Sequence, residues 1–320
     1  MEKNTKIWIA GKSGLAGSAI ARQLTAHGFC NIIGPRSREL DLRRQEETEA
    51  YIERERPDCV ILAAAKVGGI QANIASPVDF LYENLAIQDH VIHAAMKYGV
   101  QRLIFLASSC IYPRLAPQPM REEYLLDGKL EPTNEGYALA KIAGLKLCEY
   151  INRQYGYAYI SVMPCNLYGP GDSFDPIRSH VVPALIRKMH EAKTTGAPFL
   201  TLWGTGNARR ELMYSDDLAD ACVFLLENDY RDPQFLNVGT GVDMTIRELA
   251  EAIAGVVGYC GELRFDSSMP DGMPRKVLDV GRIHALGWQA KTTLQAGLKK
   301  TYEHYLTFRR FGQASVAAVQ

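Results

Sequence analysis

Residues 103–113 read LIFLASSCIYP, and the change from apolar to polar side chains within them indicates how the chain folds. The apolar residues 103–106 predict a buried strand of a parallel sheet. Ser108, Ser109 and Cys110 follow where this strand ends, and open α/β sheets bind their ligands beyond the carboxyl ends of their strands. The segment therefore predicts both an α/β fold and the edge of the sheet that carries its site.

A second polar pair lies within the helical pattern YALAK at 137–141. Tyr137 and Lys141 are four residues apart, so both side chains leave the same face of the helix. An ammonium beside a phenol favours the phenolate, which predicts a lowered pKa for Tyr137. Such a phenol can give a proton to a carbonyl oxygen while hydride reaches the carbon, and the Ser108 hydroxyl can hold the same oxygen. Tyr-x-x-x-Lys also occurs by chance, so this interpretation depends on a cofactor site elsewhere in the chain.

Such a site is predicted at the start of the chain. Residues 6–10 predict a strand that runs into a glycine-rich turn and then a helix through Leu24. Glycines allow the tight turn and the close approach of a pyrophosphate, which rests on the helix N-terminus. The predicted contacts are Gly11, Lys12, Ser13, Gly14, Leu15, Ala16 and Gly17.

The next strand, 31–33, ends without the acidic residue that usually holds the ribose of NAD. Arg36 and Arg38 follow it instead, and two guanidiniums suit a 2′-phosphate. We therefore predict NADP(H), with either arginine at the phosphate and with Asp41 and Leu42 beside the adenine. The alternative is a solvated basic turn.

Composition narrows the remaining classes. The 320 residues carry a net charge of +0, so no basic surplus points to nucleic acid or an anionic membrane. No apolar run reaches membrane-spanning length. The seven cysteines include no C-x-x-C pair and predict reduced thiols in the cytoplasm. His90 and His93 lack a third partner, so we predict no metal.

The organisation predicted is a Rossmann-type doubly wound parallel sheet with a smaller C-terminal α/β substrate lobe. Residues 1–170 form the NADP-binding domain, to which residues 210–245 return. Residues 171–308 form mainly the substrate lobe, ending in a helix over 294–308, and residues 309–320 form a flexible tail. In the substrate lobe, cations suit phosphates and an aromatic ring suits a base or sugar, although each is also typical of a solvated surface. These residues are Lys188, Trp203, Arg209 and Arg210.

These motifs together resemble the extended short-chain dehydrogenase/reductase family, and within it the GDP-L-fucose synthase branch. The resemblance covers residues 6–308 and is carried by Gly11-x-x-Gly14-x-x-Gly17, residues 64–70, 108–113, 131–137, 166–170, 179–181, 237–241 and 270–272. It implies 3,5-epimerisation of GDP-4-keto-6-deoxy-D-mannose, followed by reduction at carbon 4 with NADPH.

The resemblance also implies roles for particular residues. Cys110 is the base and His180 the acid of the epimerisation. Tyr137 donates the proton at carbon 4, Ser108 orients the ketone oxygen and Lys141 holds the nicotinamide ribose. The substrate contacts are Lys188, Trp203, Arg210 and Asp271. Further cofactor contacts are Leu106, Ala107, Ser108, Ser109, Lys141, Pro164, Cys165, Asn166, Leu167 and His180.

Three alternatives remain. One alternative is a reductase of a colitose precursor or of a 6-deoxy-heptose, which fits the same residues. A second concerns Cys110 alone, which is also explained as a small apolar residue after a strand. Leu212, Tyr214 and the loop 171–178 differ from the family pattern and leave the exact sugar open. A catalytically idle NADP-binding regulator would have no physical need for all five catalytic residues. Family members of this kind pair through the helix that carries Tyr137, so a homodimer is expected.

Overall fold

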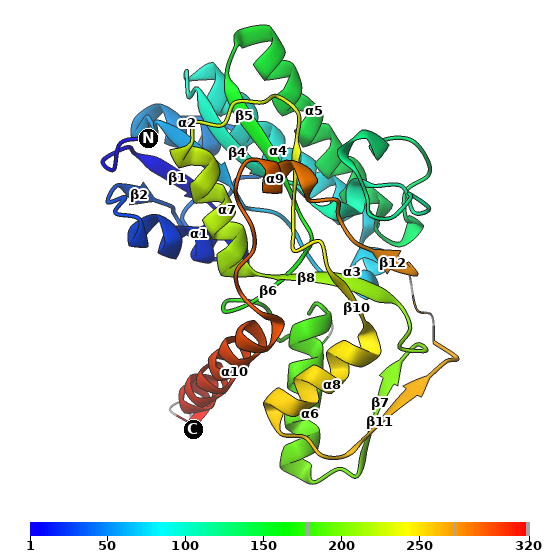
Figure 1. Ribbon diagram of the computed structural model, residues 1–320. Helices are drawn as coiled ribbons and strands as arrows, with labels where there is room; N and C mark the ends of the chain where they lie inside the picture. Colours follow the sequence, from blue (N-terminus) through cyan, green and yellow to red (C-terminus); the bar gives the residue numbers. More distant parts are fainter. Residues whose placement is uncertain (177–178, 270, 272, 318–320) are drawn as a thin grey trace.

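The computed structural model describes residues 1–176, 179–269, 271 and 273–317, which form a larger and a smaller lobe (Figure 1). A six-stranded parallel sheet forms the centre of the larger lobe. Its order is β2 (Ile32–Ile33), β1 (Ile7–Ala10), β3 (Cys59–Leu62), β4 (Arg102–Leu106), β5 (Ala158–Pro164) and β9 (Leu236–Val238). Continuous apolar runs such as IWIA and CVIL are fully buried, as a parallel sheet covered on both faces requires. The predicted α/β class is confirmed.

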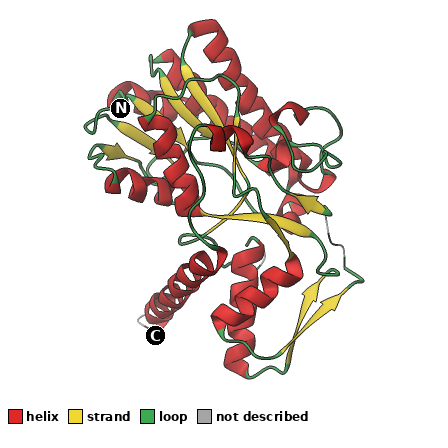
Figure 2. Cartoon of the chain, in the orientation of Figure 1, coloured by secondary structure: helices red, strands yellow, loops and turns green. Residues whose placement is uncertain are grey.

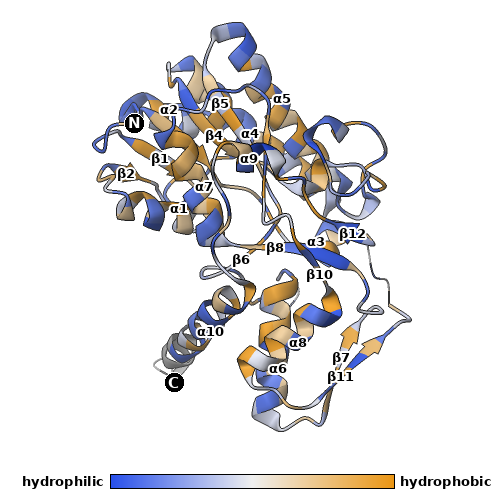
Figure 3. Ribbon diagram, in the orientation of Figure 1, coloured by the Kyte–Doolittle hydropathy of each residue, from blue (hydrophilic) through white to orange (hydrophobic). Residues whose placement is uncertain are grey.

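Helices cover this sheet in two layers (Figure 2). One layer pairs α1 (Leu15–Ala26) with α7 (Ser215–Glu227). The other contains α2 (Gln45–Glu55), α4 (Pro77–Lys97) and α5 (Glu135–Tyr155). Figure 3 shows apolar residues concentrated on the strands and on the inward faces of these helices.

A small sheet joins the two lobes. After β5 the chain forms β6 (Asn166–Tyr168), which pairs with β8 (Arg209–Tyr214). Strand β8 also pairs with β10 (Asp243–Thr245) and with β12 (Arg275–Lys276), so residues distant in sequence meet beside the end of β5.

The smaller lobe has its own apolar core. Its elements are α6 (Val181–Thr195), β7 (Phe199–Trp203), α8 (Ile246–Val257), β11 (Glu262–Asp266) and α10 (Leu294–Ala317). The remaining elements are α3 (Ile70–Ala75), α9 (Gly281–Ala285) and short 3-10 turns at Ser109–Ile111, Glu122–Tyr124 and Pro132–Asn134. None of the helices in the described ranges is long and apolar enough to cross a membrane.

The two cores bear on the predicted domain division without deciding it. Helix α7 and β9 pack in the core of the larger lobe, and so do residues 278–288, which lie outside the predicted returning segment. Helix α10 continues to Ala317, beyond the predicted end at Phe308. Residues 318–320 lie outside the described part of the chain. The boundary at residue 170 and the flexibility of the tail stay predictions.

Candidate active site

The Ser-Ser-Cys segment forms a buried turn at the carboxyl end of β4. Ser108 caps the 3-10 turn Ser109–Ile111, and its Oγ accepts a hydrogen bond from the Cys110 backbone N–H at 3.4 Å. The turn leaves Cys110 only 6% exposed, while Ser108 is less buried. A hydroxyl and a thiol are therefore presented together at the sheet edge where the sequence predicts the site.

Helix α5 places Tyr137 and Lys141 against this turn. Gly144 allows the close approach of the helix, because a Cβ there would lie 2.7 Å from the Phe105 ring. The Lys141 ammonium donates a hydrogen bond to the Leu106 carbonyl oxygen at 2.9 Å and lies 5.8 Å from the centre of the Tyr137 ring. Lys141 is 3% exposed, and this burial lowers its pKa to about 8. The predicted meeting of serine, tyrosine and lysine is present.

The predicted direction of the Tyr137 pKa is wrong for this structure. Burial raises the pKa of Tyr137, and the neighbouring Cys110 raises it further, whereas a hydrogen bond with Ser108 lowers it. Lys141 is not among the groups that shift the Tyr137 pKa, and burial disfavours the charged form of Lys141 itself. The phenol therefore keeps its proton at neutral pH, which suits a proton donor.

Lys276 is a cation of this site that acts on the pKa of Cys110. The sequence does not reveal this interaction. Burial raises the pKa of the Cys110 thiol, and Lys276 opposes this effect more strongly than Ser108 or Lys141 does. Lys276 lies on β12 opposite Arg210 of β8, and burial lowers its own pKa. No periodicity joins residue 276 to residue 110, because β12 meets β8 only in the folded chain.

His180 enters the site region from the smaller lobe. It is the N-cap of α6 and is exposed to solvent, while partial desolvation of the imidazole by the surrounding protein lowers its pKa below 6.5. The preceding residue lies against the loop after β3, since a Cβ on Gly69 would be 3.1 Å from the Ser179 carbonyl oxygen. Among the described residues, no direct contact joins His180 to Cys110.

The glycine loop fits a dinucleotide. Gly11 has a φ of +89°, in the left-handed region, and a Cβ on Gly17 would lie 2.1 Å from the Gly11 carbonyl oxygen. Gly14 is the N-cap of α1 and Leu15 its first residue, so free backbone N–H groups face the loop. Side chains are thus excluded where a pyrophosphate would rest.

The predicted adenosine end is more open. The Lys12 ammonium donates to the Ile32 carbonyl oxygen at 3.2 Å, across the end of β2. Arg36 and Arg38 are exposed on the following turn, and Arg38 lies 4.0 Å from Glu39. Hydrogen bonds from Arg43 lower the pKa of Asp41 to about 2. Leu42 places its carbonyl oxygen 3.1 Å from Nδ1 of His90.

The other predicted cofactor contacts lie at the ends of two adjacent strands. Leu106 ends β4, and Ala107 donates its N–H to the Val162 carbonyl oxygen of β5. Pro164 ends β5, and Cys165 follows it, buried. Asn166 and Leu167 belong to β6, and Asn166 donates to the Glu211 carbonyl oxygen at 3.1 Å. All of these stay predictions as cofactor contacts.

The predicted substrate residues form two pairs. The Lys188 ammonium lies 5.8 Å from the centre of the Trp203 ring, which is 55% exposed. Arg210 is partly buried, with Asp271 as its strongest charged neighbour. Asp271 accepts hydrogen bonds from the backbone and hydroxyl of Thr205 at 2.7 Å each. A cation beside an aromatic ring therefore lies on the smaller lobe, and a second, partly buried cation lies on β8 of the sheet that joins the lobes.

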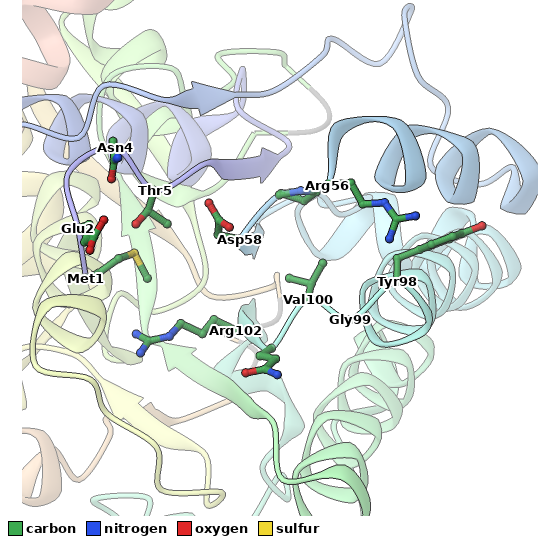
Figure 4. Close-up of a pocket in the computed structure, with 12 residues that line it drawn as sticks. Met1, Glu2, Asn4, Thr5, Arg56, Asp58, Tyr98, Gly99, Val100 and Arg102 are labelled. Atoms are coloured by element: carbon green, nitrogen blue, oxygen red, sulfur yellow. The ribbon is translucent and has the colours of Figure 1, made fainter.

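The structure also has a surface concavity that lies away from this site. A concavity of about 670 Å³ lies among Met1–Thr5, Arg56–Asp58 and Tyr98–Arg102, the segments that precede β1, β3 and β4 (Figure 4). Because the strands are parallel, this is the opposite edge of the sheet from Cys110. Among the residues described, no group of three His, Cys, Asp or Glu side chains could hold a metal ion.

A glycine cradle for a dinucleotide, beside a buried lysine and a partly buried tyrosine and serine, defines a nucleotide-dependent enzyme acting at an oxygen-bearing carbon. The chain belongs to the NAD dependent epimerase/dehydratase family, whose model matches residues 7–239. It is 53% identical over 305 residues to GDP-L-fucose synthase 1 of Arabidopsis thaliana, covering 95% of this chain and 94% of that one.

Two further relatives agree with this assignment. GDP-L-fucose synthase of Escherichia coli is 52% identical over 309 residues, covering 94% of this chain and 96% of that one. A solved structure, MlghC, a GDP-mannoheptose C4 reductase from Campylobacter jejuni with NADP bound, matches with a TM-score of 0.86 and 38% identity. That match covers 95% of this chain and 99% of the other.

Proposed function

We propose that this chain converts GDP-4-keto-6-deoxy-D-mannose into GDP-L-fucose, with NADPH as reductant. The proposal is supported by the cluster of Ser108, Cys110, Tyr137 and Lys141 at one sheet edge, and by relatives of that name at more than 50% identity. The reaction has two parts, epimerisation at carbons 3 and 5 and then reduction at carbon 4.

The epimerisation requires an enolate. Hydrogen bonds from Ser108 and Tyr137 to the ketone oxygen stabilise the negative charge that forms there, a contribution of about 3 kcal/mol per donor. Cys110 removes a proton from an adjacent carbon and His180 returns one from the other face. In the resting site the thiol is protonated and the imidazole neutral, because burial shifts both pKa values that way. The reaction needs Cys110 as the thiolate and His180 as the imidazolium. This form carries one proton on the pair, the same number as the resting thiol with a neutral imidazole, so it is reached by moving that proton from Cys110 to His180.

The reduction uses the same oxygen contacts. Bound NADPH supplies the hydride that reaches carbon 4. Tyr137 gives its phenolic proton to the oxygen, so the ketone becomes an alcohol, and Lys141 holds the nicotinamide ribose. The raised pKa of Tyr137 keeps the proton available across the neutral range.

Recognition of the nucleotide would fall to the smaller lobe. Arg210 suits a phosphate of the GDP-sugar, and Asp271 is its strongest charged neighbour. Trp203 offers a ring face for a base or sugar, next to the Lys188 ammonium. The same chemistry would accept other GDP-linked keto sugars, so the sugar itself must be tested.

The decisive experiment identifies the product. The purified chain is incubated with GDP-4-keto-6-deoxy-D-mannose and NADPH, and the product is analysed by NMR; GDP-L-fucose is expected. A parallel reaction in heavy water without NADPH should incorporate deuterium at carbons 3 and 5. Lack of deuterium at both carbons would refute the epimerase role.

A related sugar remains the second candidate, because a GDP-mannoheptose C4 reductase shares 38% of the sequence. The same NMR analysis with a panel of 4-keto GDP-sugars, including a colitose precursor and a 6-deoxy-heptose, separates the two. Faster turnover of either alternative than of the 6-deoxy-mannose derivative would replace the proposed substrate. Absence of turnover on every member would favour the NADP-binding regulator.

The choice of NADPH over NADH gives a testable prediction. Arg36→Ala or Arg38→Ala should raise the KM for NADPH about tenfold to hundredfold and leave the KM for NADH unchanged, because a charge-assisted hydrogen bond contributes about 1.5–3 kcal/mol. Steady-state kinetics with both cofactors measure this, and Arg44→Ala, an exposed arginine on the next turn, is the control. Equal efficiency of the two cofactors with the unmodified chain would contradict the role of both arginines.

We also propose a homodimer formed through α4 and α5. These helices pack together, and their outer surface carries the exposed apolar residues Val78 (74%), Tyr82 (69%) and Leu139 (45%). Tyr82→Glu should therefore shift the chain from dimer to monomer in sedimentation equilibrium. Val242→Glu, at a similarly exposed apolar residue of the β9–β10 turn, should not. A monomeric unmodified chain would contradict the proposal.

A reducing compartment, the cytoplasm, is proposed for this activity. Cys110 must remain a thiol to exchange a proton, and all seven cysteines are free in the structure. Fractionation of cells followed by detection of the chain tests the location.

A further inference from the structure

Residues 108–113 contain a buried phenol that the proposed reaction does not use. Tyr112 is the C-cap of the 3-10 turn Ser109–Ile111 and is 1% exposed. Its Oη donates a hydrogen bond to Oδ1 of Asn237 at 2.6 Å, and Asn237 belongs to strand β9. Burial raises the pKa of Tyr112, so the phenol keeps the proton that this hydrogen bond needs. The turn that carries Cys110 is therefore attached to the central sheet two residues after the thiol.

Asn237 connects this phenol to two further segments. It is the middle residue of β9 and is 0% exposed. Its Nδ2 donates to the Met120 carbonyl oxygen at 2.9 Å and to the Asp279 carbonyl oxygen at 3.1 Å. Since Oδ1 accepts from Tyr112, both polar atoms of the Asn237 side chain are engaged. A fully satisfied buried network of this kind favours one arrangement of the segments that it joins.

The two segments joined by this amide also pair with each other. The Met120 N–H donates to the Val277 carbonyl oxygen at 2.8 Å, and the Asp279 N–H donates to the Met120 carbonyl oxygen at 2.8 Å. Lys276 of β12 directly precedes Val277, and its charge lowers the pKa of the Cys110 thiol against the effect of burial. The hydrogen bonds therefore connect the turn that carries the thiol to the segment that carries this cation.

The start of the turn is held separately, by the sheet. Ala107 donates its N–H to the Val162 carbonyl oxygen of β5 at 2.9 Å, and Ser108 follows directly. Cys110 lies farther along, between Ser108 and the C-cap Tyr112. Loss of the Tyr112 hydrogen bond is therefore expected to displace the thiol more than the Ser108 hydroxyl.

We propose that Tyr112 is a positioning residue, whose hydrogen bond to Asn237 holds the Cys110 thiol in place for proton exchange with the sugar. The inference rests on the proposed epimerisation. The phenol is buried and acts through the backbone of the turn, without touching the substrate. Proton transfer needs its two atoms within hydrogen-bond reach, and a misplacement of about 1 Å can slow a reaction about 10²-fold.

The test is Tyr112→Phe in the full-length chain, with deuterium incorporation at carbons 3 and 5 of GDP-4-keto-6-deoxy-D-mannose measured by NMR. Phenylalanine keeps the ring that packs near Phe235, with ring centres 6.4 Å apart, and removes only the hydrogen bond. The kcat of exchange should fall about tenfold to 10²-fold, while the KM for the keto sugar stays within about twofold. Reduction of a 4-keto substrate that already has the product configuration should be nearly unchanged, because it uses Ser108 and Tyr137.

Tyr159→Phe is the matched control. Tyr159 is also 1% exposed, and its Oη donates to the Val100 carbonyl oxygen at 2.7 Å. Val100 precedes β4 whereas Cys110 follows it, so this variant loses an equivalent buried hydrogen bond at the other edge of the sheet. Thermal melting should show a similar loss of stability in the two variants. Only Tyr112→Phe should lose exchange activity.

The outcomes separate this inference from the proposed function. Exchange in Tyr112→Phe as fast as in Tyr159→Phe would overturn the positioning role. An equal fall of exchange and reduction in Tyr112→Phe would also overturn it, because the phenol would then support the whole site and not the thiol in particular. Absence of exchange in the unmodified chain would instead refute the proposed epimerisation, and with it this inference.

Discussion

Replacing Tyr137 by Phe should lower the rate of NADPH oxidation with the keto sugar about 10²-fold to 10⁴-fold, the range typical of a lost general acid. The phenol is partly buried, and its raised pKa keeps it protonated at neutral pH. Phenylalanine retains the ring that meets Phe80 edge-on, with ring centres 6.4 Å apart, so the packing of α5 is preserved. Only the proton donor is removed.

The companion measurements distinguish catalysis from structure. The Kd of NADPH should stay within about twofold, since Lys141 and the glycine cradle are untouched. Deuterium exchange in heavy water should also fall, because the enolate loses one of two hydrogen-bond donors, a loss of about 3 kcal/mol. Tyr150→Phe, an exposed tyrosine on the same helix, is the matched control and should leave both rates unchanged. A Tyr137→Phe variant with undiminished NADPH oxidation would remove this residue from the mechanism.

The sequence predicted the parallel sheet well because its signals are local. Apolar runs before polar turns mark β1, β3, β4 and β5, and each run has an ordinary physical reason to be a buried strand. The serine and cysteine follow directly from where β4 ends. The four-residue spacing of Tyr137 and Lys141 needs only the geometry of one helix.

The features that the sequence did not reveal depend on contacts between distant segments. Lys276 reaches the surroundings of Cys110 through the pairing of β12 with β8. The Tyr137 pKa depends on how far the side chain is buried, which the four-residue spacing does not encode. Burial in the same place also disfavours the charged form of Lys141.

The contrast between local signals and contacts of distant segments also explains which cofactor and substrate residues can be recognised in the sequence. Gly11 and Gly17 are recognisable in sequence because the turn itself requires them, and the structure gives the reason in the close approach of their backbones. Arg36 and Arg38 lie exposed on one turn, so neither the sequence nor the fold ranks one above the other. Lys188 and Trp203 come together only because α6 and β7 belong to one small core.

The second large effect is expected for Cys110→Ser, which should slow deuterium incorporation at carbons 3 and 5 about 10²-fold to 10⁴-fold. A serine hydroxyl has nearly the same size but is a far weaker acid, so it cannot serve as the base. A 4-keto substrate that already has the product configuration should still be reduced, because Tyr137 and Ser108 remain. Cys30→Ser, at an exposed cysteine, is the control.

The pH profile of exchange in the unmodified chain gives this assignment a second test. The Cys110–His180 pair needs one shared proton, so the rate should be bell-shaped. Protonation of His180 removes activity on the acid side, and its lowered pKa places that limb below pH 6.5. Loss of the Cys110 proton removes it on the alkaline side, and the raised thiol pKa places that limb above pH 9. In Cys110→Ser the alkaline limb should disappear from the residual rate. Its persistence there would assign the limb, and the proton transfer behind it, to another group such as Lys276 or Lys141.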